Sequence, residues 1–393
     1  MGSVVGGNSS NLFEQQGGGD AVEDYVPRQV PLFYPRQIVL AKGSCSTPER
    51  RRFVERIFSV YPRAKVVEQF AVPHNKIAFP STDPLELHYQ GHRTLVFGEH
   101  KSAVGQSDEA GNTCPNFWHF SPYGYCPYGC QYCYLSGTQG VRFSPSVKIF
   151  VNLKEILAEV DVRARRIGRP DAFYLGKLQD GMALDPLTGY SRRMIRFFAD
   201  HPFARLRILS KAADFRNVLD LDHRGHTVLT WTLNPPAVRE HYEAITPPVE
   251  ERIAAMKQCA AAGYAVRAMI MPILPISDWR EHYDRFLEQL LSTVPLDRLT
   301  LGGICSYGPA LNLMERKLCK NDVVVRSLSV LNTGSDDGRA RFPRNLRHEM
   351  YAHLLKTIRR CQPGLTCSLC MEDVTLAREL VPAENIGKCN CVL

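Results

Sequence analysis

Residues 123–134 read YGYCPYGCQYCY and carry the densest chemical signal in the chain. Cys126, Cys130 and Cys133 lie within eight residues, and turn-forming glycine and proline residues and aromatic side chains surround them. Thiolates are the soft ligands that iron–sulfur clusters require, and glycines let a loop curl around such a cluster. Three cysteines at this spacing therefore predict a [4Fe-4S] cluster with one iron that has no protein ligand. Such an iron can bind and activate a small molecule.

Two other interpretations of this loop are weaker. A zinc knuckle usually pairs two CxxC motifs or adds histidines, and neither lies close by in the sequence. Three cysteines that only pack in a core would be an unusual accident at this spacing beside so many turn-forming residues.

Length and composition are those of a globular protein. The chain has 393 residues, of which 44% are hydrophobic and 22% charged, and no apolar run approaches the length of a membrane span. We therefore expect no membrane partner. The 13 cysteines are interpreted as cytoplasmic thiols available to metal. A formal charge of +8 only weakly favours an anionic partner.

Strands alternate with helices through the middle of the chain. Strands are expected at 147–151, 173–176, 207–210, 227–232, 265–271 and 299–303, and helices at 153–166, 191–199, 213–219 and 249–262. This alternation predicts an α/β fold with a parallel sheet and right-handed crossovers. About six such units suit a partial (β/α)6 barrel, with active groups at the carboxyl ends of the strands.

The chain is expected to divide into four parts. Residues 1–25 are rich in Gly, Ser and Asn and predict a disordered tail. Residues 26–112 predict a small N-terminal α/β subdomain, and 113–310 the partial barrel with its cysteine loop. Residues 311–393 predict a helical extension, with a loop near 332–345 and a helix at 348–360.

The C-terminal extension is rich in cysteine. Its last thiols are Cys361, Cys367, Cys370, Cys389 and Cys391. The CxxC pair of Cys367 and Cys370, followed by the CxC pair of Cys389 and Cys391, could form a second metal site, including a second iron–sulfur cluster, or redox-active thiols. Ordinary tail thiols are the alternative.

Beyond the cysteines, the chain resembles the spore photoproduct lyase family of radical S-adenosylmethionine (SAM) enzymes, from about Pro35 to Tyr307. The resemblance is carried by four short segments of this sequence: CYL at 133–135, VNLKEIL at 151–157, LSK at 209–211 and MPI at 271–273. It implies a radical SAM barrel, a [4Fe-4S] cluster and bound SAM. It also implies a reductant protein such as flavodoxin or ferredoxin.

The resemblance implies roles for particular residues. Cys126, Cys130 and Cys133 would ligate the cluster, whose open iron would chelate SAM and cleave it to a 5′-deoxyadenosyl radical. The residues expected to contact SAM are Lys211, Thr232 and Asn234. Tyr132 and Tyr134 would line the site and relay a hydrogen atom, although a tyrosine in a core more often only packs.

The chain departs from the family at residues 175–182, which read LGKLQDGM. The DNA-repairing lyases have a hydrogen-donating cysteine here, and many relatives have a glutamate where this chain has Lys177. Asp180 could take part of that glutamate's role toward SAM, or could cap a helix. A thiol from the tail, Cys389 or Cys391, could replace the missing hydrogen donor.

The sequence is compatible with four functions. The leading one is a radical SAM enzyme that abstracts hydrogen from a nucleoside- or sugar-like small molecule in a tailoring reaction, because the donor cysteine is missing. The alternative is lyase-type repair of a thymine dimer in DNA. A second alternative is a non-catalytic nucleic-acid module that binds zinc through the tail cysteines. A scaffold that keeps the cluster without SAM cleavage is a further possibility.

Overall fold

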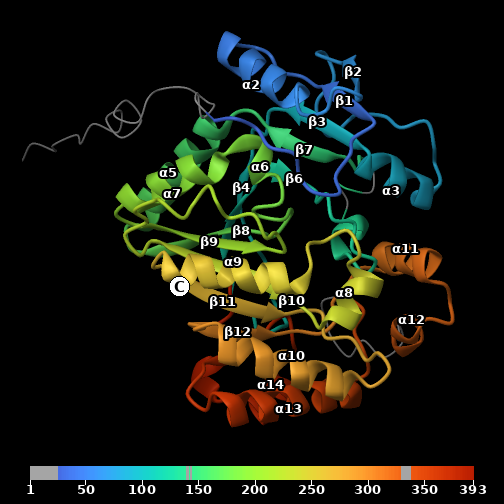
Figure 1. Cartoon of the computed structure of the whole chain (residues 1–393), viewed down its shortest axis with the longest axis vertical. Coiled ribbons are helices and arrows are strands. Elements are labelled where there is room, and N and C mark those ends of the chain that lie inside the picture. Colours follow the sequence, from blue (N-terminus) through green and yellow to red (C-terminus); the bar gives the residue numbers. More distant parts are fainter. Residues whose placement is uncertain (1–24, 139–140, 142–143, 329–337) are drawn as a thin grey trace, which may run out of the picture.

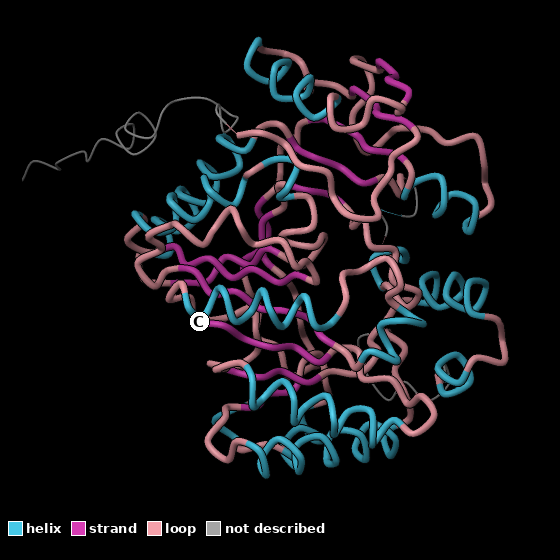
Figure 2. Tube along the Cα trace, in the orientation of Figure 1, coloured by secondary structure: helices cyan, strands magenta, loops and turns pink. Residues whose placement is uncertain are grey.

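The computed structural model describes residues 25–138, 141, 144–328 and 338–393. The expected tail at 1–25 falls almost entirely outside these residues, as does the first part, 332–337, of the expected loop at 332–345. The described chain forms two β-sheets with helices around them (Figures 1 and 2). In this part of the chain no helix is both long and apolar enough to span a bilayer.

The smaller sheet has five strands in the order β2-β1-β3-β7-β6. Its strands are β1 (Gln37–Leu40), β2 (Lys65–Glu68), β3 (Thr94–Gly98), β6 (Tyr123–Gly124) and β7 (Val147–Phe150). All its pairs are parallel except β6 with β7. Two capped helices flank it: Thr47 caps α2 (Pro48–Phe58) and Asp83 caps α3 (Pro84–His92), and each cap side chain accepts a backbone N–H of the first turn.

The larger sheet has eight strands in the order β13-β12-β11-β10-β9-β8-β5-β4. They are β4 (Val104–Gln106), β5 (Trp118–Phe120), β8 (Asp171–Leu175), β9 (Ala204–Ser210), β10 (Thr227–Leu233), β11 (Ala265–Ile270), β12 (Arg298–Leu301) and β13 (Cys367–Leu369). Seven of these strands run parallel, and only β4 pairs antiparallel. The mixed α/β fold with a parallel barrel-like sheet is therefore confirmed.

Helices connect these parallel strands and cover the outside of the sheet (Figure 1). The connecting helices are α5 (Leu153–Ile167), α6 (Asp185–Thr188), α7 (Tyr190–Asp200), α8 (Pro236–Tyr242), α9 (Val249–Ala261) and α10 (Trp279–Thr293). The C-terminal third adds α11 (Gly308–Leu318), α12 (Val323–Ser327), α13 (Arg344–Cys361) and α14 (Val374–Leu380). Apolar residues recur at helical spacing, so that each long helix buries one face; α7, for example, buries Met194, Ile195 and Phe198.

Two expectations about individual elements are wrong. The strand expected at 147–151 as the first barrel strand is β7, which pairs with β3 in the smaller sheet. The sheet order β8-β5 shows that β5 takes its place in the barrel. Residues 213–219 are not helical: 213–215 are irregular and 216–219 form turns, and Asp214 and Asn217 bind Arg28 from the N-terminal segment. The hydrophobic pattern of a short segment gives no information about partners that are distant in the sequence.

The larger sheet also takes in residues from beyond the expected barrel. β4 precedes residue 113, and β13 adds a strand that lies beyond residue 310, beside β12. The proposed division into four parts stays a prediction.

Candidate active site

The cysteine loop leaves β6 and ends at a short 3-10 turn, η1 (Tyr134–Gly137). Two residues in it have positive φ: Tyr125 at 60° and Gly129 at 57°. Glycine adopts this conformation without cost. Tyr125 is held in it by two histidines of α3, because its hydroxyl lies 3.0 Å from His88 Nδ1 and 3.2 Å from His92 Nε2. Helix α3 therefore fixes the start of the loop.

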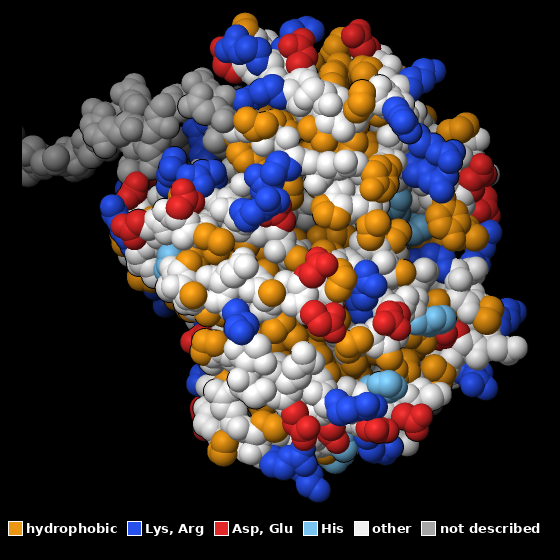
Figure 3. Space-filling model, in the orientation of Figure 1, with side chains coloured by type: hydrophobic (Ala, Val, Ile, Leu, Met, Phe, Trp, Pro, Cys, Tyr) orange, Lys and Arg blue, Asp and Glu red, His pale blue; other side chains and the backbone are white. Residues whose placement is uncertain are grey.

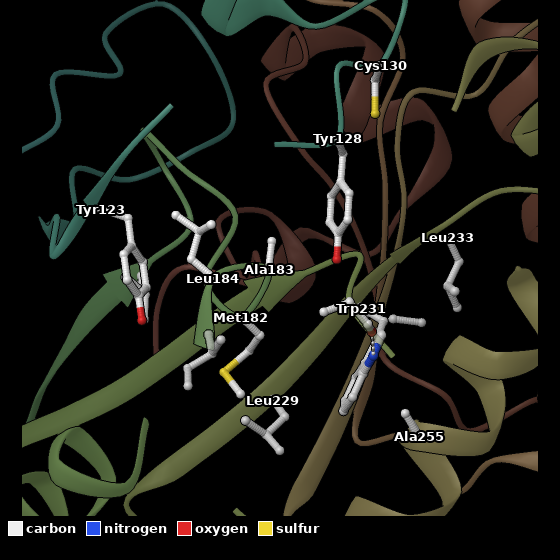
Figure 4. Packing of buried hydrophobic residues seen from close by; sticks show 14 of the residues in the cluster. Tyr123, Tyr128, Cys130, Met182, Ala183, Leu184, Leu229, Trp231, Leu233 and Ala255 are labelled. Carbon is white, nitrogen blue, oxygen red and sulfur yellow. Dashed lines mark hydrogen bonds between the residues drawn. The ribbon is translucent and has the colours of Figure 1, made fainter. Parts of the chain in front are cut away.

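Cys126, Cys130 and Cys133 all line one cavity of about 170 Å³. The same cavity is lined by residues at or just after the carboxyl ends of barrel strands: Asp180 after β8, Lys211 after β9, Thr232 on β10, Met271 after β11 and Ser306 after β12. This is where the parallel fold predicted active groups. Tyr128 extends from the loop toward Trp231 in the core, so the loop is anchored by packing (Figure 4).

A buried carboxylate, Glu243, connects the cysteine loop to the barrel. Its side chain accepts hydrogen bonds from the Tyr132 hydroxyl and, at 3.0 Å, from Asn234 Nδ2, and it pairs with Arg252. Burial alone would raise the pKa of Glu243. The Lys211 and Arg252 cations and these hydrogen bonds outweigh burial and lower the pKa to about 2. Glu243 is therefore ionised.

Lys211 is the cation that faces the cavity. Burial by itself would lower its pKa, but attraction to Glu243 and the nearby Cys130 outweighs burial, and the pKa is raised. Its ammonium nitrogen lies 5.8 Å from the centre of the Tyr132 ring. A half-buried lysine beside three thiols can bind a carboxylate of a small ligand.

Asp180 joins the ends of β8 and β9. One carboxylate oxygen accepts hydrogen bonds from Met182 N, Ala183 N and Ser210 Oγ at 2.9, 2.8 and 2.6 Å, and the other accepts from Lys211 N at 2.7 Å. The side chain thus fixes the backbone of Lys211. Asp180 also lines the cavity, but its two oxygens already have these partners.

A second cavity of about 170 Å³ adjoins the first, and six residues line both: Tyr134, Gly176, Leu209, Met269, Met271 and Cys305. The Tyr134 hydroxyl donates to the Lys177 carbonyl oxygen. Cys370, Cys389 and Cys391 line the second cavity, together with Cys114. Lys177 and Arg339 bring two cations to it, and Glu109 pairs with both at 3.4 and 3.3 Å.

Most of the predicted site residues meet at these two cavities, and two do not. Asn234 is fully buried and does not line either cavity. Its Nδ2 donates to Glu243 at 3.0 Å, and its Oδ1 accepts from the Tyr283 hydroxyl at 3.0 Å. Cys367 is buried on β13, away from the other tail thiols. The roles predicted for the site residues stay predictions.

Sequence reasoning missed Cys114 and Cys305. Cys114 lies in the loop before β5, far in sequence from the tail that it contacts. Cys305 follows β12 and is half-buried between the two cavities. The one sequence signal for Cys305 is that it follows a predicted barrel strand.

The residues present fit a [4Fe-4S] cluster and SAM. Three thiols face one cavity, as a cluster with an open iron requires. Lys211 offers a cation for a carboxylate, and the strand-end backbone that presents it is fixed by Asp180.

Residues 34–301 match the sequence model of the spore photoproduct lyase family, and this is more than half of the chain. The chain therefore belongs to the spore photoproduct lyase family. The family resemblance predicted from the sequence is confirmed.

Curated relatives and solved structures agree with this. The spore photoproduct lyase of Bacillus subtilis (strain 168) is 29% identical over 227 residues, which cover 57% of this chain and 64% of the relative. The match therefore spans a little under two thirds of that relative. The lyase of Geobacillus sp. (strain Y412MC61) is 26% identical over 277 residues, 68% of this chain and 77% of the relative.

A solved spore photoproduct lyase complexed with dinucleoside spore photoproduct has the same fold. It superposes with a TM-score of 0.73 at 22% identity, over 86% of this chain and 99% of that one. A double variant of the lyase with bound AdoMet (SAM) and dinucleoside spore photoproduct gives a TM-score of 0.72.

Proposed function

We propose that this protein is a radical SAM lyase that reverses a thymine-dimer lesion of the spore photoproduct type in nucleic acid. The observation that carries the proposal is that the three loop thiols line a cavity that continues into a second one. A cluster held by Cys126, Cys130 and Cys133, with SAM, would supply the 5′-deoxyadenosyl radical. Membership of the lyase family supports this chemistry.

The chain's own residues bind and orient the cofactor in this proposal. Lys211 pairs with the SAM carboxylate, because it is a half-buried cation that lines the first cavity. Asp180 positions Lys211 through the backbone hydrogen bond of 2.7 Å. Tyr132 holds the cysteine loop in place through its hydrogen bond to Glu243, and Thr232 lines the first cavity.

The second cavity would hold the lesion. Lys177 and Arg339 offer cations to a phosphodiester, and Phe117 and Tyr174 offer aromatic faces to the bases. On the face shown in Figure 3, basic side chains are interspersed with acidic ones. This face therefore offers no broad basic surface, and we assign recognition of the lesion to the cavity.

The sequence alone ranked small-molecule tailoring above repair. The family match, and solved relatives with dinucleoside spore photoproduct bound, favour the repair interpretation. A protein electron donor of the flavodoxin or ferredoxin type and a cytoplasmic location stay predictions.

The test is anaerobic turnover. The reconstituted protein is given SAM, dithionite and dinucleoside spore photoproduct, and 5′-deoxyadenosine and repaired thymidine are measured. We expect both products from the native chain. We expect neither from the Cys126→Ala, Cys130→Ala and Cys133→Ala variants. Cys361→Ala is the matched control, because this thiol is exposed and distant from the loop in sequence.

Two outcomes would overturn the proposal. A fully loaded cluster that yields no 5′-deoxyadenosine would exclude radical SAM chemistry. SAM cleavage that leaves the dinucleoside lesion and lesion-bearing DNA unchanged, but converts undamaged nucleosides, would support the tailoring function.

A further inference from the structure

Four thiols from three separate segments meet beside the second cavity. Cys114 comes from the loop before β5, Cys370 follows β13, and Cys389 and Cys391 lie in the C-terminal tail. The sulfur atoms of Cys114 and Cys370 are 3.8 Å apart although 256 residues separate them. Within the described residues, Cys114, Cys370 and Cys389 are the one set of three metal-ligand side chains whose ligand atoms all lie within 4.8 Å of one another.

We propose that Cys114, Cys370, Cys389 and Cys391 bind one zinc ion in a tetrahedral tetrathiolate site that fastens the C-terminal tail to the barrel. This site differs from the tail site expected from the sequence, because Cys114 replaces Cys367. It does not rest on the proposed lyase function.

The sulfur spacing favours one metal ion over a cluster. A zinc–sulfur bond of about 2.3 Å in a tetrahedron places neighbouring sulfurs about 3.8 Å apart, and Cys114 and Cys370 have this separation. The thiolates of a cubane point outward from different irons and stand farther apart. The three thiols of the cysteine loop, which fit a cubane, do not form a set whose sulfur atoms all lie within 4.8 Å of one another.

The fourth ligand needs a small adjustment. The sulfur of Cys391 lies 2.7 Å from that of Cys389. This contact is closer than a tetrahedral edge by about 1 Å, so the two thiols must spread when the ion enters. The thiol protons are released to solvent as the ion binds.

The backbone around the thiols is fixed before any metal binds. Thr113 Oγ1 donates to the Leu369 carbonyl at 3.0 Å, and Thr113 N donates to the Glu372 carbonyl at 2.7 Å. These bonds tie the Cys114 loop to the segment that carries Cys370. Met371 N donates to the Cys114 sulfur, with 3.2 Å between them. Such N–H donors stabilise a thiolate.

The tail is held by three arginines of the sheet. Arg298 donates to the Cys389 carbonyl at 3.1 Å, and Arg207 and Arg267 each donate to the Val392 carbonyl at 3.2 Å. Their cations offset the net negative charge of a zinc ion with four thiolates. Cys114, Cys389 and Cys391 are 6%, 1% and 6% exposed and Cys370 is half-buried, so most of the site is shielded from solvent, as in structural zinc sites.

The experiment separates this site from the cysteine loop. The variant with Cys126, Cys130 and Cys133 all replaced by Ala is purified anaerobically, titrated with Zn²⁺ or Co²⁺, and analysed for metal. We expect one ion per chain. We also expect cobalt to show the intense visible bands and sulfur-to-metal charge transfer of a tetrahedral thiolate complex.

Substitutions in this background identify the ligands. Cys114→Ala or Cys370→Ala should weaken metal binding at least about 100-fold, more than the loss of an outer-shell contact. Cys367→Ala is the matched control and should bind as before. Cys391→His keeps a ligand and should retain cobalt, with a spectrum that changes toward three sulfurs and one nitrogen. This last variant guards against a simple failure to fold.

Three results would overturn the proposal. The first is an octahedral cobalt spectrum or no metal at all. The second is iron and sulfide taken up at the tail in preference to zinc. The third is a disulfide between Cys389 and Cys391 in the anaerobically purified chain.

Discussion

The Glu243 carboxylate and the Arg252 guanidinium form an ion pair with no solvent exposure on either side chain, at 3.0 and 3.1 Å. The pair lies under the cysteine loop, since Tyr132 also donates to Glu243. Removing the carboxylate leaves a buried guanidinium without its counter-charge. Removing one partner of a buried ion pair lowers the free energy of unfolding by about 3–5 kcal/mol.

Glu243→Ala should therefore lower the free energy of unfolding by about that amount. Urea unfolding monitored by circular dichroism measures it, with Glu240→Ala on the exposed face of α8 as the control. Glu243→Gln, which keeps the hydrogen-bonding oxygen, should cost less. A loss below about 1 kcal/mol for Glu243→Ala, the range of exposed pairs, would contradict the prediction.

A second prediction concerns pH. Lys148 on β7 is 6% exposed, and its ammonium donates to the Ser144 and Ser146 carbonyls at 2.7 and 3.1 Å. Burial lowers the pKa of Lys148 to about 7. Between this value and the ordinary pKa of about 10.4, the unfolded chain binds more protons, so stability rises with pH.

Lys148→Met should remove this rise. Between pH 7.5 and 9.0 we expect the native chain to gain about 1–2 kcal/mol relative to the variant, at up to about 1.4 kcal/mol per pH unit. Urea midpoints at the two pH values measure the difference. The exposed Lys101→Met should behave as the native chain. Equal pH dependence in native protein and Lys148→Met would show that Lys148 titrates normally.

A third prediction concerns SAM. Lys211→Met should weaken SAM binding about 10- to 100-fold, because a charge-assisted hydrogen bond contributes about 1.5–3 kcal/mol. Iron content should not change, since Lys211 supplies no thiol. Equilibrium dialysis with labelled SAM measures the affinity, and Lys257→Met on the exposed face of α9 is the control. Unchanged affinity would remove Lys211 from the SAM site.

The fourth prediction concerns the hydrogen donor. If zinc occupies Cys389 and Cys391, these thiols cannot donate hydrogen, and Cys305 is a thiol that lines both cavities. Cys305→Ala should then keep 5′-deoxyadenosine formation and lose most of the repaired product. Full repair by Cys305→Ala would exclude Cys305 as the hydrogen donor.

The cysteine loop could be predicted from local sequence alone. The spacing of Cys126, Cys130 and Cys133 within one loop encodes a cluster site, because ligands so close in sequence need no distant partner. The alternation of strands and helices likewise predicted the parallel sheet. Lys211 and Thr232 could be placed at strand ends for the same reason.

Other features depended on contacts between distant segments. Cys114 joins Cys370 and Cys389 only because the loop before β5 is hydrogen-bonded to the end of β13 and the segment after it. The buried Glu243 gives no sequence signal, since its partners Tyr132 and Arg252 come from the cysteine loop and α9. Sequence by itself determined which residues can bind metal within one loop. Tertiary structure decided which distant thiols and charges meet, because long-range packing sets those distances.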